Sequence, residues 1–346
     1  MPVGTAATVK GLRQESLEEL GAEIILANTY HLYLRPGHPL IRKLGGLHRF
    51  MSWGRAILTD SGGYQVFSLA DLRRITDEGA RFRSHLDGSE HLLTPESAAE
   101  IQLALGSDIA MVLDECIETP APRAAAESAV RRTTIWARRA REHFLEYARR
   151  NGETGQAQFG IVQGATFADL RRESARQLLD LEFPGYAVGG LAVGEPHALT
   201  CEMTGEVTAL LPRDKPRYLM GVGRPEQIAD YVALGIDMID CVLPTRAARH
   251  GCLYTSAGRV LIRKARYAED QKPLDERCAC SVCKRYTRAY LRHLFAAREL
   301  LGSVLATHHN VHFYLDLLRQ IREAIRFEKL ASFSSEMHAR YSGDAA

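Results

Sequence analysis

The stretch Gly235 to Cys241, which reads GIDMIDC, is one of seven short apolar runs that each close on or near a polar residue or a glycine. A longer amphipathic stretch generally separates one run from the next, which predicts alternating strands and helices and therefore a parallel sheet. Seven such units favour a closed (β/α)8 TIM barrel over an open doubly wound sheet. We expect the eighth strand within Gly251 to Lys264. The other six runs are Glu23 to Asn28 (EIILAN), Arg55 to Asp60 (RAILTD), Asp108 to Asp114 (DIAMVLD), Gln158 to Gln163 (QFGIVQ), Gly185 to Gly190 (GYAVGG) and Arg217 to Val222 (RYLMGV).

Polar residues and glycines at the carboxyl ends of these runs are the first candidates for a functional site. In a barrel the carboxyl ends of all strands meet at one face, and active sites are built there. Any single residue of this kind is more often a turn residue or a helix cap than a catalytic group. Six together, three of them carboxylates, favour a site: Asp60, Asp114, Gln163, Gly190, Gly221 and Asp240.

The two aspartates of GIDMIDC cannot serve the same site. Asp237 and Asp240 are an odd number of residues apart, so strand alternation places their side chains on opposite faces. Asp240 is nearer the carboxyl end of the strand and is the better candidate for a nucleophile. We expect Asp237 to be a structural residue near the other rim.

The stretch Thr59 to Gln65 (TDSGGYQ) places Asp60 at the end of a strand. Its two glycines let the backbone approach a ligand closely, and Tyr64 can stack on that ligand. Taken alone, the glycine pair is an ordinary turn. Beside a second carboxylate such as Asp240, however, Asp60 could transfer protons while its partner attacks an anomeric carbon, as in retaining glycosyl transfer.

Three of the seven cysteines, Cys278, Cys280 and Cys283, are crowded together, and His308 and His309 follow later in the chain. Crowded cysteines indicate a metal site rather than disulfides. Three thiolates and one imidazole make a closed tetrahedral zinc set, in which the metal is structural and does not activate water. Spacing leaves the choice between the two histidines open, and a chance cluster of reduced thiols is the alternative.

The net charge of +2 conceals an uneven distribution of basic residues. From Arg246 to Arg298 there are 13 Lys and Arg against 4 Asp and Glu, which leaves 31 basic and 38 acidic residues elsewhere. Such a segment is either a solvated face or an electrostatic footprint for a phosphate backbone. No run approaches the length of a membrane span and no secretion signal is seen, so we expect a soluble, cytoplasmic protein with no membrane partner.

Several long motifs, in order along the chain, resemble those of bacterial-type tRNA-guanine transglycosylases, the queuine or preQ1 tRNA-ribosyltransferase family. The resemblance runs from Met1 to about Tyr341. The motifs that carry it are TDSGGYQVFSL, FRSHLDGSEHLLTPE, GIVQG, GYAVGGLAVGE, YLMGVGRPE, DCVLPTRAARHG and CACSVC.

The resemblance implies an enzyme, a pentosyltransferase that exchanges guanine at the wobble position of tRNA for preQ1, a step in queuosine biosynthesis. Its substrates would be tRNAs with GU(N) anticodons, those for aspartate, asparagine, histidine and tyrosine. Asp240 resembles the nucleophile that attacks C1′ of the wobble ribose and forms a covalent tRNA–Asp240 intermediate. Asp60 resembles the general acid/base that deprotonates the incoming base.

The resemblance also implies a pocket for the base, which must leave its stack to enter. The carboxylate of Asp114 suits guanine N1–H and the exocyclic amine, while Gln163 and the backbone N–H of Gly190 suit O6. Tyr64 and Met220 would sandwich the ring. The implied base-binding residues are Ser61, Gly62, Gly63, Tyr64, Asp114, Gln163, Gly190, Leu191 and Met220.

Two segments resemble tRNA-contacting parts of the family, with Arg246 and Arg249 expected to reach the anticodon. The family also suggests a homodimer with one structural Zn²⁺ per subunit. We expect a barrel over residues 1–255, a zinc-binding, tRNA-contacting subdomain over 256–325 and a helical tail packed on the barrel over 326–346. The implied tRNA contacts are Gly221, Val222, Gly223, Arg224, Pro225, Glu226, Gln227, Thr245, Arg246, Ala247, Ala248 and Arg249, and the implied zinc ligands are Cys278, Cys280, Cys283 and His309.

The turn Leu191-Ala192-Val193-Gly194 resembles the bacterial form of the family, whereas eukaryotic relatives have Leu-Ser-Gly-Gly. Val193 leaves less room beside the pocket than glycine does. We therefore expect preQ1, a small aminomethyl base, to be preferred over the bulkier queuine.

Three alternatives compete with this interpretation. The archaeal-type enzyme, which modifies the tRNA D-arm, is disfavoured because its C-terminal RNA-binding extension is missing. A non-catalytic tRNA-binding subunit is disfavoured by the presence of both Asp60 and Asp240. A metal-dependent hydrolase would need ligands at the strand ends, whereas the clear ligand set lies elsewhere.

The start of the sequence departs from the family pattern, because relatives have a further segment of β-structure before the position of Met1. We expect either a late start codon or a truncated gene. Loss of that segment would uncover apolar surface at one end of the barrel.

Overall fold

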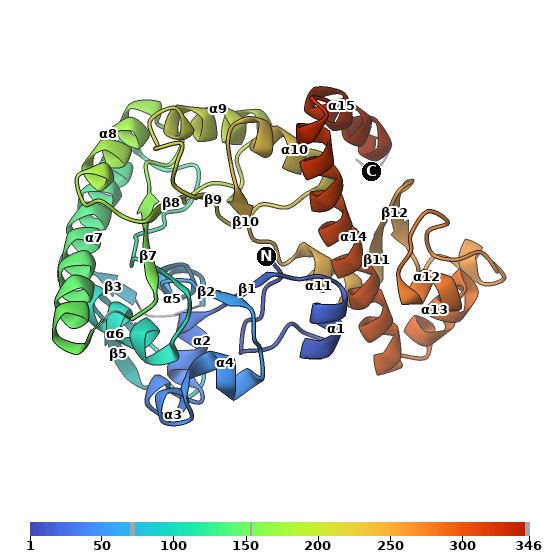
Figure 1. Cartoon of the computed structure of the whole chain (residues 1–346), viewed down its shortest axis with the longest axis horizontal. Coiled ribbons are helices and arrows are strands. Elements are labelled where there is room, and N and C mark those ends of the chain that lie inside the picture. The colour runs from blue at the N-terminus through green and yellow to red at the C-terminus, as the bar shows by residue number, and fades with distance from the viewer. Residues whose placement is uncertain (70–72, 153, 343–346) are drawn as a thin grey trace.

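The computed structural model describes residues 1–69, 73–152 and 154–342. In this part of the chain all seven predicted strands are present, and they form one curled parallel sheet in sequence order (Figure 1). The register places Leu26 opposite Leu58 and Val162 opposite Val188, so the strand ends lie level. The strands are β1 (Ile24–Ala27), β2 (Ala56–Thr59), β6 (Ile109–Met111), β7 (Ala157–Val162), β8 (Gly185–Val188), β9 (Arg217–Leu219) and β10 (Met238–Ile239).

The extended backbone of Pro2 and Val3 joins the two edges of this sheet. Val3 forms a parallel bridge with Leu26 of β1, and Pro2 forms one with Cys241, which follows β10. The amide of Leu26 donates to the carbonyl oxygen of Pro2 over 3.0 Å. These contacts close the sheet, and the predicted TIM barrel is confirmed.

The eighth strand is not where the sequence analysis placed it. Residues 251–264 hold an antiparallel hairpin of β11 (Cys252–Thr255) and β12 (Gly258–Leu261), which among the described strands pair only with each other. The hydroxyl of Thr255 accepts a bond from Ala257 N and donates to the carbonyl oxygen of Gly258, which reverses the chain within two residues. The prediction was wrong because this stretch holds two short apolar segments, which a turn at Ser256 and Ala257 folds against each other.

Helices cover the outer face of the sheet (Figure 1). In α7 the buried residues recur at helical spacing, as in Ala126, Val130, Ala137 and Phe144, and form one stripe toward the sheet. The helices up to the hairpin are α1 (Gln14–Glu19), α2 (Thr29–Leu34), α3 (His38–Lys43), α4 (Gly46–Met51), α5 (Gly63–Leu69), α6 (Pro95–Leu105), α7 (Arg123–Asn151), α8 (Ala168–Leu179), α9 (His197–Thr208), α10 (Pro225–Ala233) and α11 (Leu243–Arg249).

A small antiparallel sheet, absent from the sequence-based prediction, is inserted between α5 and α6. It consists of β3 (Arg73–Ile75), β4 (Ala80–Arg83) and β5 (Glu90–Leu93). In β4, Ala80 and Phe82 are buried while Arg81 and Arg83 are exposed, the alternation of a sheet with one wet face.

The C-terminal region has its own hydrophobic core, formed by residues such as Leu253, Val260, Leu291 and Phe295. Helix α14 begins at this core and continues along the barrel, where Tyr314 joins the barrel core. Helix α15 packs beside α10 (Figure 1). The domain limits remain a prediction, and residues 343–346 of the predicted tail lie outside the described residues. The elements are η1 (Ala265–Tyr267), α12 (Ser281–Arg285), α13 (Arg288–Ala296), α14 (Leu300–Arg326) and α15 (Leu330–Tyr341).

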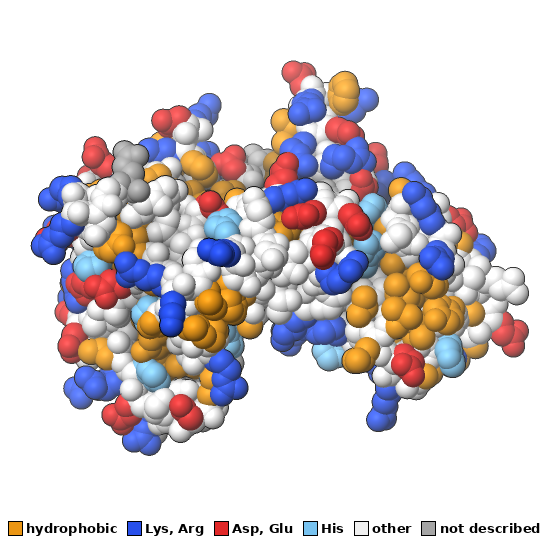
Figure 2. All heavy atoms as spheres, turned by 60° about the horizontal axis from the view of Figure 1, so that its bottom comes forward, with side chains coloured by type: hydrophobic (Ala, Val, Ile, Leu, Met, Phe, Trp, Pro, Cys, Tyr) orange, Lys and Arg blue, Asp and Glu red, His pale blue; other side chains and the backbone are white. Residues whose placement is uncertain are grey.

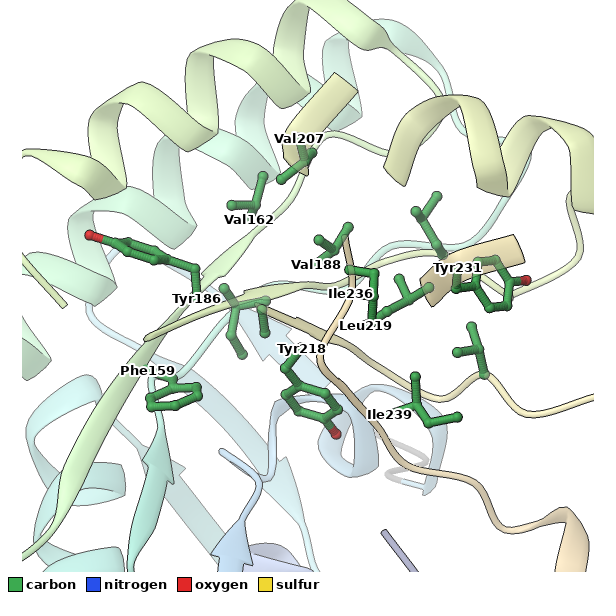
Figure 3. Close-up of a cluster of buried hydrophobic side chains, with 14 of the residues drawn as sticks. Phe159, Val162, Tyr186, Val188, Val207, Tyr218, Leu219, Tyr231, Ile236 and Ile239 are labelled. Atoms are coloured by element: carbon green, nitrogen blue, oxygen red, sulfur yellow. The ribbon is translucent and has the colours of Figure 1, made fainter. Parts of the chain in front are cut away.

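The core beneath the site is assembled from neighbouring strands and the helices that cover them. Figure 3 shows Phe159 of β7, Tyr186 of β8 and Tyr218 of β9 among these buried side chains. Such packing holds the strand ends in fixed positions. Within the described residues, none of the helices combines the length and apolar character that crossing a bilayer would require.

Candidate active site

A cavity of about 320 Å³ lies at the carboxyl ends of the strands. Gln163 lies directly behind its wall, where it bonds to Asp114. Gly62 lies between Ser61 and α5, and Gly63 is the first residue of that helix, next to Tyr64. The predicted site residues that line the cavity are Asp60, Ser61, Tyr64, Asp114, Gly190, Leu191, Met220, Gly221 and Asp240.

Asp60 follows β2 directly and is buried in a cradle of N–H donors. Its Oδ1 accepts from the backbone N of Thr29 at 2.9 Å, and its Oδ2 accepts from Gln65 Nε2 at 3.0 Å and from Asn28 Nδ2. Burial nevertheless raises the pKa of Asp60 from 3.8 to about 6, with the nearby charge of Asp240 adding to the shift and the donors opposing it. A carboxyl group whose pKa lies near neutral pH can both accept and donate a proton.

Asp240 follows β10 and is only half-buried. Its Oδ1 accepts from the phenol of Tyr218 at 2.6 Å and from the backbone N of Gly221 at 2.8 Å. Among the described residues Oδ2 has no hydrogen-bond partner, and the side chain lines the cavity. One oxygen is therefore held while the other can approach a ligand.

Asp237 lies at the opposite end of β10, where it lines a second hollow beside Glu23 and Ile24 at the amino ends of the strands. Its Oδ2 accepts from the backbone N of Arg217 at 2.9 Å at the start of β9. The predicted separation of the two aspartates is therefore observed, and Asp237 has a structural contact.

Asp114 closes the floor of the cavity three residues after β6. Its Oδ1 accepts from the hydroxyl of Ser61 at 3.1 Å, and its Oδ2 accepts from Gln163 Nε2 at 2.7 Å. Burial raises the pKa of Asp114 to about 6 although both bonds favour the ionised form. A base with N–H groups could donate further hydrogen bonds to this carboxylate and take the place of water there.

Gly190 shows why a glycine is needed at the end of β8. Its φ is +63°, and a Cβ there would lie 2.2 Å from Oε1 of Gln163. Behind the loop the fully buried guanidinium of Arg171 donates to the carbonyl oxygens of Gly189 and Gly190 at 2.9 and 3.2 Å. The backbone N–H of Gly190 is thus held at the cavity by contacts that leave no room for a side chain.

Tyr64 and Met220 come from different elements and line the same cavity. Tyr64 is the second residue of α5 and is 51% exposed, whereas Met220 follows β9 and is half-buried. An exposed aromatic ring at the mouth of a pocket leaves a flat surface free for stacking. Their role as the two sides of a base sandwich stays a prediction.

The two predicted tRNA-contacting segments lie at the same rim. Residues 221–224 connect β9 to α10 and residues 225–227 begin α10, whereas residues 245–249 form most of α11 after β10. Arg224 and Arg246 are exposed, whereas Arg249 is half-buried and donates to the carbonyl oxygen of Thr245 at 2.8 Å. Four residues of these segments have buried side chains, so they could support the backbone of the rim but not contact tRNA through their side chains: Val222, Pro225, Thr245 and Ala248.

The predicted metal ligands are brought together. The ligand atoms of Cys278, Cys280, Cys283 and His309 all lie within 4.8 Å of one another. His309 Nδ1 lies 3.7, 3.6 and 3.3 Å from the three sulfur atoms, and sulfur and nitrogen ligands of a tetrahedral zinc ion are about 3.5 Å apart. This cluster could hold a metal ion.

The choice between the two histidines is resolved by their hydrogen bonds. His309 is fully buried, and its Nε2 donates to the carbonyl oxygen of Tyr254 at 2.7 Å, which leaves Nδ1 for a metal. His308 instead lies with Nε2 3.0 Å from the hydroxyl of Ser281. The cluster belongs to the C-terminal core, away from the barrel cavity.

The sequence analysis missed the residues that hold the two catalytic candidates. Asn28 and Thr29 follow β1, and Tyr218 lies within β9. Asn28 closes a predicted strand and was a detectable signal, but nothing in the local sequence of Tyr218 distinguishes it from a core tyrosine. His31 and Cys116 also line the cavity and were not singled out.

The cavity of this parallel barrel holds two carboxylates in different hydrogen-bond environments, and the pKa of one of them, Asp60, is raised to about 6. These features are typical of an enzyme of the TIM-barrel class. A family model described as queuine tRNA-ribosyltransferase matches residues 1–343. The chain belongs to this family of pentosyltransferases, and the prediction of such an enzyme is confirmed.

Relatives named queuine tRNA-ribosyltransferase cover nearly all of the chain. The protein from Solibacter usitatus is 61% identical over 326 residues, which is 94% of this chain and 86% of the relative. That from Koribacter versatilis is 58% identical over 331 residues, with the same coverage. That from Caldanaerobacter subterraneus is 56% identical over 344 residues, which is 99% of this chain and 90% of the relative.

Proposed function

We propose that the protein exchanges guanine for preQ1 at the wobble position of tRNAs with GU(N) anticodons, those for aspartate, asparagine, histidine and tyrosine, as a step in queuosine biosynthesis. The similar proteins from Koribacter versatilis and Solibacter usitatus are named queuine tRNA-ribosyltransferase. The proposal rests on the presence of Asp60 and Asp240 in one cavity. Asp60 is buried and accepts hydrogen bonds from three N–H donors, whereas Asp240 is bonded through Oδ1 and has Oδ2 available for a ligand.

In the first half-reaction, Oδ2 of Asp240 attacks C1′ of the ribose as the bond from C1′ to N9 of guanine breaks. The electrons of that bond pass to the guanine ring, which takes a proton from Asp60. The product is a covalent tRNA–Asp240 ester and free guanine. Tyr218 and Gly221 hold Oδ1, which keeps Oδ2 directed at the cavity.

In the second half-reaction, preQ1 replaces guanine in the cavity. Asp60 accepts the proton from N9 of preQ1, whose nitrogen attacks C1′ and displaces the carboxylate of Asp240. This cycle restores both residues and replaces one difficult displacement by two easier ones. Its kinetic signature is a ping-pong pattern.

The base pocket is supported by donor and acceptor chemistry. The ionised Asp114 would accept from N1–H and the exocyclic amine. The N–H of Gly190 and the second hydrogen on Nε2 of Gln163, whose first already bonds to Asp114, would donate to O6. Ser61 and Gln163 already bond to Asp114, so its orientation is set before the base arrives. Leu191 adds an apolar edge, and Tyr64 and Met220 cover the two faces.

Preference for preQ1 over queuine rests on the loop after β8. Val193 lines the cavity, and its backbone N donates to Glu195 Oε2 at 3.1 Å. The second oxygen of Glu195 accepts from Ala192 N and from the hydroxyl of Thr200. A loop held in this way cannot easily move to admit a larger substituent.

Binding of tRNA is supported by the position of the two rim segments and by the basic stretch from Arg246 to Arg298. Gly221 of the first segment lines the cavity, and the second segment follows Val242, which also lines it, so an anticodon loop held there would deliver its base to Asp240. Figure 2 shows Lys and Arg side chains around the hydrophobic side chains of the C-terminal region. Lys and Arg contacts to phosphates supply sequence-independent affinity.

For the cluster in the C-terminal core, we propose one structural Zn²⁺ per subunit on Cys278, Cys280, Cys283 and His309. Bound zinc would crosslink the loop before α12 to α14 and so stabilise a small core. It takes no part in the reaction.

We further propose a homodimer in the cytoplasm. Large apolar side chains are exposed on α13 and at the start of α14, including Tyr290, Leu301 and Leu300, which is 84% exposed. Figure 2 shows hydrophobic side chains gathered over the C-terminal subdomain. A second copy would cover this surface, and Leu300→Glu should then yield monomers in analytical ultracentrifugation.

The experiment that tests the proposed reaction is capture of the intermediate. Incubation with a GU(N) tRNA transcript lacking other modifications, followed by denaturing electrophoresis, should show a protein–RNA adduct. Asp240→Asn should abolish the adduct, and free preQ1 should discharge it in the parent. Absence of the adduct in an enzyme that still exchanges labelled guanine would rule out the covalent route.

A further inference from the structure

A second group of metal-ligating side chains lies outside the barrel cavity and outside the cysteine cluster. It consists of His197 at the start of α9, Asp230 in α10 and His338 in α15, whose ligand atoms all lie within 4.8 Å of one another. The side chains of His197 and Asp230 are each 24% exposed and that of His338 is 45% exposed. The proposed reaction uses none of these residues.

The geometry of the three ligand atoms suits a metal ion. Nε2 of His197 and Nε2 of His338 each lie 2.8 Å from the same carboxylate oxygen, Oδ2 of Asp230. Two ligands at about 2.1 Å from an ion and at right angles to each other are about 3 Å apart. An ion could therefore replace the shared hydrogen bonds with little movement of the side chains.

In His197 and Asp230, the side-chain atom that would not bind the ion already has a partner. The Nδ1 of His197 lies 3.1 Å from the phenol of Tyr231, which is buried, and Oδ1 of Asp230 accepts from the hydroxyl of Ser334. Such outer contacts orient imidazole and carboxylate ligands in metal sites. On binding, the proton of His197 would move from Nε2 to Nδ1, where the oxygen of Tyr231 can accept it.

We propose that His197, Asp230 and His338 form a second metal site, for a divalent transition metal such as Zn²⁺, that fastens the C-terminal helix α15 to the barrel. Two imidazoles and one carboxylate select such ions over Mg²⁺ and Ca²⁺, which take oxygen ligands. The ligands come from three helices far apart in sequence. The ion would act together with the bond from Tyr341 to the carbonyl oxygen of Thr255, which ties the end of α15 to the hairpin.

The test compares metal stoichiometry in the full-length protein and in matched variants. After dialysis against a weak chelator, each protein is equilibrated with Zn²⁺ or Co²⁺ and the bound metal is counted by mass spectrometry. His338→Gln and His197→Gln each remove one ligand. His143→Gln is the control, because His143 faces a single carboxylate, that of Glu100, at 3.3 Å.

The parent and His143→Gln should bind one ion per chain more than His338→Gln and His197→Gln. This difference does not depend on the occupancy of the cysteine cluster, which all four proteins share. Zn²⁺ should raise the melting temperature more, and slow proteolysis of α15 more, in the parent and His143→Gln than in the two ligand variants. Equal stoichiometry in all four proteins would overturn the proposal and leave the group as a hydrogen-bonded cluster.

A further variant separates a metal site from a fold defect. Tyr231→Phe keeps all three ligands and removes only the outer contact to His197, so it should retain the extra ion but weaken its binding by roughly 10- to 100-fold. Guanine exchange into tRNA, which uses none of these residues, confirms that each variant is folded. A folded Tyr231→Phe with unchanged metal affinity would argue against the assigned role of His197.

Discussion

The phenol of Tyr218 donates a hydrogen bond of 2.6 Å to Oδ1 of Asp240, and Tyr218 itself is fully buried in the wall of the barrel. The neighbouring amide of Gly221 donates to the same oxygen. One oxygen of Asp240, the proposed nucleophile, is therefore held by Tyr218 of β9 and by the loop that follows this strand. In the proposed reaction, Tyr218 would position the attacking oxygen without touching the base.

Tyr218→Phe should lower kcat for base exchange by roughly 10- to 100-fold, the equivalent of one hydrogen bond to a charged group, with little change in KM for tRNA. The ring would still fill the core, so the protein should remain folded. Steady-state kinetics with labelled guanine measures the effect. Tyr33→Phe, which removes a phenol bonded to His91 outside the cavity, should leave kcat unchanged. An equal loss in both variants would contradict a positioning role.

Activity should depend on the ionisation of Asp60 and Asp114, whose pKa values burial raises to about 6. Both carboxyls are ionised above that pH, where Asp60 can accept the proton of the incoming base and Asp114 can accept its N–H donors. Below it both become protonated. We therefore expect kcat/KM for the free base to be constant above pH 7 and to fall below pH 6.

Because two groups titrate, the logarithm of kcat/KM should fall with a slope that rises from one toward two as the pH decreases. Asp114→Asn should retain a slope of one at lower overall activity. A profile that is flat down to pH 5 would show that neither carboxyl titrates where its burial indicates.

Gly190→Ala should damage the base pocket more than the backbone strain alone explains. The new Cβ would stand 2.2 Å from Gln163 Oε1, so the amide must move and lose its bond to Asp114. We expect KM for guanine to rise by more than about tenfold, the cost of one buried hydrogen bond to a charged group. Gly21→Ala is the matched control, since its φ is +83° but nothing lies within 4 Å of the added carbon. A similar KM for both variants would contradict the argument.

His309→Ala and His308→Ala should differ sharply although the residues are adjacent. The first removes Nδ1 from the metal cluster and the bond from Nε2 to Tyr254, while the second removes only an outer contact to Ser281. His309→Ala should lose bound zinc and lower the melting temperature, because metal binding and folding of this core are coupled. Metal analysis and calorimetry measure both effects. Retention of zinc by His309→Ala would transfer the ligand role to another residue, and His312, 3.5 Å from the sulfur of Cys278, is the nearest candidate.

The sequence predicted those parts of the site that follow directly from strand ends. Asp60, Asp114 and Asp240 each terminate an apolar run, and parallel strands bring their carboxyl ends together whatever the loops do. The opposite placement of Asp237 followed from strand parity. The candidate metal cluster was visible because Cys278, Cys280 and Cys283 lie close together in the sequence.

What the sequence could not predict depends on contacts between distant segments. The donors of Asn28 and Thr29 to Asp60 arise from the pairing of β1 with β2. Pro2 and Val3, which close the barrel, do not lie in an apolar run, so no local pattern predicts their role. The hairpin of β11 and β12 is apolar and was therefore wrongly predicted to hold the eighth strand. The group at His197 is formed by three helices whose packing no local pattern encodes.

Arg246 should contribute to tRNA binding through its charge. It is exposed on α11 at the rim of the cavity, and the helix places it beside the site where a phosphate backbone would pass. Arg246→Ala should weaken binding of all tRNA substrates alike and reduce the slope of log K against log salt by about 0.7 to 0.9. Arg322→Ala removes the same charge from the exposed surface at the opposite rim, beside Asp237, and should leave that slope unchanged. Filter binding over a series of salt concentrations measures both slopes. An equal reduction of the slope in both variants would mean that the net charge of the protein attracts the tRNA without a defined binding surface. A reduction only in Arg246→Ala would indicate a phosphate contact at the mouth of the cavity.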